Sequence, residues 1–74
     1  MNTSELKSML NEMKIDPEFY SLTGGLPLEA LCIEDADGKW SVYYSERGAR
    51  QGEKTFATES EACEYFLSVA DDLR

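Results

Sequence analysis

Hydrophobic residues recur at helical spacing near the start of the chain. They lie three and four residues apart, at Leu6, Met9, Leu10 and Met13. This spacing predicts an amphipathic helix over residues 4–14. Asn2, with Glu5 three residues later, matches a capping box for the first turn of this helix. Asp16 and Pro17 mark its end, because the residue before a proline avoids the helical region, and the same pair can cap and begin one further helical turn.

A second, broader apolar stripe occupies the last part of the chain. Its members share one face of a helix and are Ala62, Cys63, Phe66, Leu67, Ala70 and Leu73. Thr58 precedes the stripe and is followed by Glu61 three residues later, which is again a capping-box pattern. We therefore expect a second helix over residues 59–72, with its apolar stripe against the core.

The middle of the chain has the alternating pattern of strands. We expect strands over residues 28–34, 39–46 and 53–57. A turn at residues 35–38 and a glycine-containing loop at residues 47–52 join them, and both connections are short enough for antiparallel hairpins.

The strand over residues 39–46 has two different faces, because successive side chains point to opposite sides of a sheet. One face carries Trp40, Val42 and Tyr44. The other carries Ser41, Tyr43 and Ser45. We expect the C-terminal helix to cover the first face and Trp40 to be largely buried. Tyr43 then lies on the more open face or under the first helix, either as a packed core tyrosine or as an aromatic contact surface.

These elements predict an α+β fold, in which an N-terminal and a C-terminal helix flank a three-stranded antiparallel meander (α-β-β-β-α). Residues 1–74 are expected to form one small domain. A domain of this size buries only about 60–65% of the surface that its unfolded chain exposes, so its stability is low. Its core has no room for a deep substrate cavity, which favours a protein that acts through its surface.

The chain is strongly acidic. Its net charge is −8, from 15 acidic against 7 basic residues. This charge opposes binding to nucleic-acid phosphates or to anionic lipid, and it favours and accelerates association with a basic partner. Acidity that merely keeps a small protein soluble is the alternative explanation.

Residue types that carry catalysis are scarce. The chain has no histidine, which is the commonest general base and metal ligand. Cys32 and Cys63 lie among apolar neighbours, so we expect buried, reduced thiols, with a disulfide between them as the alternative. We expect no catalytic residue, no metal and no cofactor. The first fourteen residues lack the apolar run of a signal peptide, and no segment is long enough to span a bilayer, so we expect a cytoplasmic protein.

Two further patterns resemble ligand-binding motifs. The segment DADG at residues 35–38 resembles the start of a calcium loop, but Lys39 and Trp40 stand where an oxygen ligand and a glycine are required. The meander ending in TFATESEACEYF resembles the sheet-and-helix DNA-binding domains of plant AP2-type and integrase N-terminal modules. Four cations on the second hairpin fit that resemblance, namely Lys39, Arg47, Arg50 and Lys54. Acidic residues surround them, so we expect no nucleic-acid binding.

Acidic residues gather at two places. One group, Glu59, Glu61 and Glu64, begins the second helix and complements its dipole. The other surrounds the first hairpin, at Glu29, Glu34, Asp35 and Asp37, where turn propensity explains only the aspartates. We expect the partner-binding site to consist of Glu34, Asp35, Asp37 and, as an aromatic anchor, Tyr43.

The block from about Tyr20 to Phe66 resembles small immunity proteins of bacterial polymorphic and contact-dependent toxin systems. Three segments carry the resemblance: YSLTGGLPLEALCI, WSVYYSERG and TFATESEACEYF. It implies a protein that binds one basic toxin domain, often a nuclease, and blocks its active site. The alternative function is a small acidic interaction or regulatory adaptor encoded by a phage or mobile element, without catalysis. A homodimer formed through a sheet edge is a further open alternative.

Overall fold

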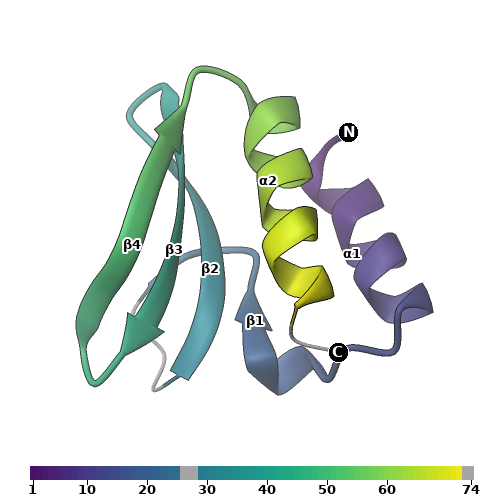
Figure 1. Ribbon diagram of the computed structural model, residues 1–74. Helices are drawn as coiled ribbons and strands as arrows, with labels where there is room; N and C mark the ends of the chain where they lie inside the picture. Colours follow the sequence, from purple (N-terminus) through teal and green to yellow (C-terminus); the bar gives the residue numbers. More distant parts are fainter. Residues whose placement is uncertain (26–28, 73–74) are drawn as a thin grey trace.

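Four strands form a single mixed sheet, and both helices lie on one side of it (Figure 1). The computed structural model describes residues 1–25 and 29–72. In chain order the elements are α1 (Thr3–Glu12), the 3-10 helix η1 (Pro17–Phe19), β1 (Tyr20–Ser21), β2 (Glu29–Ala36), β3 (Lys39–Glu46), β4 (Ala49–Phe56) and α2 (Glu59–Asp71). The spatial order of the strands is β1-β2-β3-β4. The α+β class and the antiparallel meander of β2, β3 and β4 are thus confirmed.

Side-chain caps define where the helices begin. Asn2 Oδ1 accepts a hydrogen bond from the backbone N–H of Glu5, and Glu5 Oε1 accepts one from the N–H of Asn2, so the predicted capping box is present. Asp16 caps η1 by accepting a hydrogen bond from the N–H of Glu18. Thr58 Oγ1 does the same for the third residue of α2. Each cap satisfies a backbone donor that the helix itself leaves unpaired.

Helix α1 ends two residues before the expected position, at Glu12. Lys14 adopts a left-handed conformation with φ of 60°, and its N–H donates to the carbonyl of Asn11. The N–H of Ile15 donates to the carbonyl of Leu10, which completes a Schellman motif. The motif turns Ile15 back into the core against Leu10, and this packing stops the helix before the proline does.

Both hairpin turns contain two residues with positive φ. They are Asp37 and Gly38 in the first turn and Arg47 and Gly48 in the second. Such two-residue turns match the right-handed twist of the strands that they join. The first turn follows from its Asp-Gly sequence. The second is tighter than the expected loop over residues 47–52, so β4 already begins at Ala49.

Strand β4 contains an irregularity within residues 49–52, for which the sequence pattern predicts a loop. The register shifts between Val42 and Tyr44, which pair with Lys54 and Gln51, respectively. One residue of β3 therefore faces two of β4, and Gly52, with φ of 61°, supplies the left-handed conformation that this bulge requires. Gly52 therefore lies at a bulge within the strand. The expected strand over residues 53–57 covers the second half of β4, which begins four residues earlier and ends one residue earlier, at Phe56.

Strand β1 was not expected. Its two residues, Tyr20 and Ser21, run parallel to β2 and pair with Leu31 and Cys32. Two residues are too few to leave an alternating pattern in the sequence. Tyr20 packs against the core, where its ring meets that of Phe66 edge to face at 6.5 Å between centroids. The predicted strand start at residue 28 and the apolar residue Leu73 lie outside the described residues.

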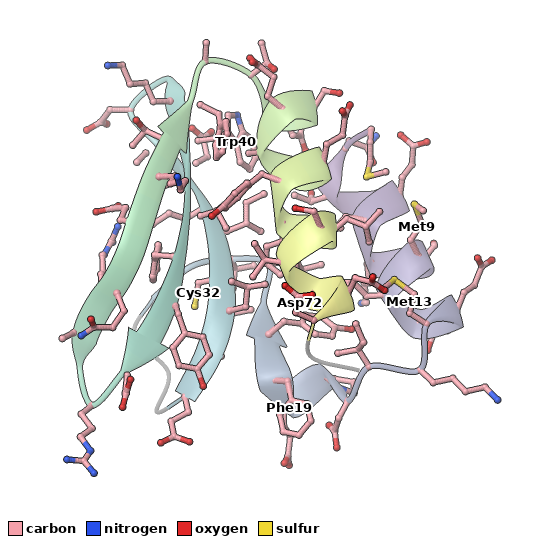
Figure 2. All side chains as sticks on the ribbon, in the orientation of Figure 1. Met9, Met13, Phe19, Cys32, Trp40 and Asp72 are labelled. Carbon is pink, nitrogen blue, oxygen red and sulfur yellow. The ribbon has the colours of Figure 1, made fainter. Side chains whose placement is uncertain are left out.

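The main core lies between the sheet and α2. Helix α2 packs directly on β2, β3 and β4, and α1 packs on α2. The buried members of this core are Leu6, Leu10, Ile15, Leu31, Ile33, Val42, Ala62, Cys63, Phe66 and Ala70. Trp40 packs against this cluster but is only partly buried, contrary to expectation. It pairs with Phe56 close to the hairpin turn, at the margin of the surface that α2 covers (Figure 2).

The two helices run in the same direction, with their N-termini side by side (Figure 1). The amino group of Met1 donates to Ser60 Oγ at 3.2 Å, and the N–H of Thr3 donates to Glu59 Oε2 at 2.9 Å. The first residue of α2 therefore helps to cap α1. A parallel pair also places both C-termini at the other end of the helical layer. Among the described helices, none has the length and apolarity needed to cross a membrane.

The difference in burial between Phe66 and Trp40 predicts different costs of truncation. Phe66 has an exposed fraction of 0% and contacts both Tyr20 and the sheet core. Phe66→Ala should lower the free energy of unfolding by about 3–5 kcal/mol. Trp40→Ala should cost less, because water already reaches part of the indole in the folded protein. Urea unfolding of both variants measures the two values. A larger loss for Trp40→Ala than for Phe66→Ala would contradict this assignment of the core.

Candidate functional site

The second face of the sheet is buried without a helix to cover it. Ala30, Cys32 and Tyr43 form a separate core cluster there, with exposed fractions of at most 2%. Figure 1 shows the chain after β1 passing behind β2 and β3, on the side away from the helices. The Tyr43 hydroxyl donates to the carbonyl of Gly25 in this segment at 2.5 Å. We call residues 22–25 the crossing segment.

The crossing segment lies very close to β2. An added Cβ atom at Gly24 would lie 2.6 Å from Glu34 Cβ, and Gly24 has φ of 76°. Both the contact and the backbone conformation therefore require glycine at this position. Ser21 Oγ holds the segment by donating to the carbonyl of Gly24 at 2.9 Å. The Gly-Gly pair is thus a packing element, because it lets backbone take the place of a helix over this face.

Arg50 covers the other side of Tyr43. Its guanidinium carbon lies 4.2 Å from the centroid of the Tyr43 ring, which is a cation–π arrangement. Arg50 also forms ion pairs with Glu34 and, at 2.7 Å, with Glu53. Arg50 is opposite Ser45 on β3, so it shares the face of Tyr43. The sequence did not predict this role of Arg50. Its position opposite Ser45 depends on a two-residue turn at Arg47 and Gly48 and on the bulge in β4, and neither was predicted.

Burial favours the uncharged forms of Tyr43 and Cys32. It raises the pKa of the Tyr43 hydroxyl above the ordinary value of 10.0, and the nearby Cys32 and Glu34 add to the shift. Burial likewise raises the pKa of the Cys32 thiol above 9.0, although the hydrogen bond with Tyr43 opposes this change. A thiol with a raised pKa is a poor nucleophile. Tyr43 and Cys32 thus form part of a closed, buried layer that covers the second face of the sheet.

Both cysteines are free and buried, as expected. Cys63 belongs to the core under α2, and burial raises its pKa as well. Cys32 belongs to the cluster on the opposite face of the sheet. The sheet therefore separates the two sulfur atoms, and the alternative of a disulfide between them is wrong for this structure.

The predicted partner-binding residues do not form one surface. Glu34 and Asp35 are neighbours on a strand and therefore point to opposite faces. Glu34 is held by Arg50, whereas Asp35 and Asp37 are exposed at the first hairpin. Tyr43 has an exposed fraction of 1%, so its ring is not available as the expected aromatic anchor. Of the four residues, Asp35 and Asp37 remain accessible to a partner.

The cations of the second hairpin are also divided between the two faces. Arg50 lies over Tyr43 on the face away from the helices. Lys54 lies on the helix side, with its ammonium nitrogen 5.7 Å from the ring centroid of Tyr65 on α2. Within residues 1–25 and 29–72, no group of three or more histidine, cysteine, aspartate or glutamate residues is arranged to hold a metal ion.

Two grooves open on the helical side of the molecule. The larger, of about 840 Å³, lies between α1 and the β1 edge and is lined mainly by polar side chains, including Lys7, Asn11 and Ser21. The smaller, of about 490 Å³, lies between Met13, which follows the last residue of α1, and the side of α2 from Glu64 to Asp71. Its lining residues are Met13, Glu64, Leu67, Ser68 and Asp71. We call it the interhelical groove. It combines apolar side chains with carboxylates.

Alanine substitutions at the two glycines of the crossing segment should have unequal effects. Gly24→Ala adds a clash with Glu34 to the strain of a positive φ, and it should lower the free energy of unfolding by more than about 2 kcal/mol. Gly25 has φ of 86° but nothing within 4 Å of an added Cβ, so Gly25→Ala should cost only about 1 kcal/mol. Thermal or urea unfolding tests this. Equal losses would show that the close approach is not a constraint.

The raised pKa of Tyr43 predicts a loss of stability at alkaline pH. The folded protein keeps the phenolic proton at a pH where the unfolded chain releases it, so this contribution is complete below about pH 10 and falls as the pH rises further. Its slope is at most about 1.4 kcal/mol per pH unit. Tyr43→Phe has no proton to lose, so the free energy of unfolding should fall less steeply above about pH 10 than in the parent protein. Parallel curves for the two proteins would contradict the shift.

Comparisons of this chain with protein-family models, with curated proteins and with solved structures found no match. The resemblance to immunity proteins therefore depends on the three quoted sequence segments.

Proposed function

We propose that the protein is a toxin-neutralising immunity protein, which binds a basic toxin domain and blocks its active site. The observation that carries the proposal is the net charge of −8 on a chain of 74 residues. A charge of this size repels nucleic acid and anionic lipid and attracts a basic protein. A nuclease toxin is basic where it holds phosphate, so an acidic protein can occupy the same surface as its substrate.

The distribution of charge supports a role in binding. Arg50 is bound by Glu34 and Glu53 within the molecule. The acidic side chains Asp35, Asp37 and Glu46 are exposed at opposite ends of β2 and β3. Such exposed charges mainly raise the rate at which a partner of opposite charge associates. Tight binding also needs an apolar contact near the centre of the interface.

If the proposal is correct, this protein protects a cell from the toxin that an adjacent gene encodes. An immunity gene should lie directly downstream of the gene for its toxin. The protein encoded upstream should arrest growth when it is expressed alone in a bacterial host, and co-expression of this protein should restore growth. The purified pair should associate faster at low salt than at high salt, because salt screens charges beyond a Debye length of about 10 Å at 0.1 M.

Removal of two exposed negative charges tests whether electrostatic attraction accelerates association. Asp35→Asn with Asp37→Asn should slow association about tenfold at low salt and have little effect at high salt. An upstream product that is harmless to the host, or a partner that binds but still arrests growth, would argue for the adaptor function instead. An association rate that responds neither to salt nor to these substitutions would remove the electrostatic argument.

A further inference from the structure

The interhelical groove lies where two helix dipoles end side by side. Helices α1 and α2 are parallel, so their carbonyl ends lie at the same end of the helical layer (Figure 1). The carbonyl end of a helix carries a partial negative charge and favours cations. Neither α1 nor α2 has a basic residue in its last turn. The pairing of the helices thus creates a negative potential that their own last turns do not offset.

Acidic side chains add to this potential. Glu12 ends α1, Asp71 ends α2 and Asp72 caps its C-terminus. Glu64 lies near the middle of α2, where it accepts a hydrogen bond from Ser60 Oγ, and it lines the groove together with Asp71. Among the described residues next to this end, Lys14 is the cation, directly after α1. Acids at the C-terminus of a helix lower its stability. The charge of Glu12, Asp71 and Asp72 therefore does not complement the helix dipoles, and together with the dipoles it attracts cations.

The groove also has an apolar part. Met13 and Leu67 line it and are only partly buried. Met9, one turn before Met13 on α1, has an exposed fraction of 37% and extends the apolar surface along the helix (Figure 2). Methionine side chains are flexible and adapt to different apolar partners. A groove of about 490 Å³ accepts one or two large side chains.

We infer that the interhelical groove binds a basic amphipathic helix of a partner protein. An apolar side chain of that helix enters between Met13 and Leu67, and its lysines or arginines face Glu64 and the carbonyl ends of α1 and α2. This is the helix-in-groove mode, with an apolar anchor and charges at the rim. A second copy of this chain is a poor occupant, because it also has a net charge of −8 and would be repelled. The inference deepens the proposed function and rests on it for the basic character of the partner.

Model peptides test the groove without knowledge of the partner. The probe is a fluorescent Leu/Lys peptide of about 15 residues, with leucines three and four positions apart. Its control has the same composition in an order that spreads the leucines around the helix. At about 0.15 M salt, where long-range attraction is screened, the amphipathic peptide should bind the full protein about tenfold more tightly than the control. Amide chemical shifts should change at the residues that line the groove.

Variants of the protein locate the site. Met13→Ala and Leu67→Ala should each weaken binding of the amphipathic peptide about fivefold. Glu64→Gln should weaken it about threefold, whereas Glu46→Gln, the same charge change on the sheet, should leave it unchanged. Met13 is partly exposed and Glu64 is exposed, so these two substitutions should leave folding intact. They test the groove even if Leu67→Ala affects folding. Equal binding of the two peptides, shifts confined to the sheet, or variants that bind like the parent would each overturn the inference.

The growth assay separates this inference from the proposed function. If the parent protein neutralises an upstream toxin and the three groove variants do so with unchanged affinity, the immunity function stands and the groove is not its site. If no toxic neighbour exists but the amphipathic peptide binds the groove, the groove stands and the immunity function is wrong.

Discussion

The contact between the crossing segment and Tyr43 closes the half of the molecule that has no helix. A four-stranded sheet presents two faces, and this chain provides helices for only one of them. On the other face, backbone near Gly24 and Gly25 and the guanidinium of Arg50 exclude water from Tyr43 and Cys32. Because a domain of this size has little apolar area to bury, the second face cannot be left open without losing much of its stability.

How far the sequence predicts the structure depends on how local each signal is. The capping box of α1, the N-cap of α2 at Thr58, a turn within residues 35–38 and the apolar face of α2 are local signals, and each was predicted correctly. The reciprocal half of the second capping box is not formed, because Glu61 accepts from the Thr58 hydroxyl. The start of β4 was missed. The second turn consists of Arg47 and Gly48 alone, so residues 49–52 belong to the strand, and Gly52 suggested a loop because it lies at a bulge. The burial of Tyr43 and the position of Arg50 depend on contacts between distant segments, which no local pattern contains.

The acidic composition has different consequences in different parts of the fold. Glu5 at the start of α1 and Glu59 at the start of α2 both accept hydrogen bonds from backbone N–H groups at the N-terminus of α1 and stabilise it. Glu34 is used to hold Arg50 against Tyr43. In the interhelical groove, Glu64 and Asp71 lie beside apolar side chains. The structure buries Tyr43 and pairs Glu34 with Arg50. The sequence could not show this, because a position along the chain does not reveal which strand face a side chain takes.

The bulge at Gly52 also bears on how the protein behaves at high concentration. Strand β4 is eight residues long and forms an edge of the sheet, which is the geometry that recruits strands from other molecules into aggregates. A bulge interrupts the regular spacing of backbone donors and acceptors along such an edge and increases its twist. Charged side chains lie on both sides of the bulge along β4, with Arg50 before Gly52 and Glu53 and Lys54 after it. A continuous ladder between two β4 edges would have to accommodate two bulges at once, so the irregularity protects the folded protein against edge-to-edge assembly.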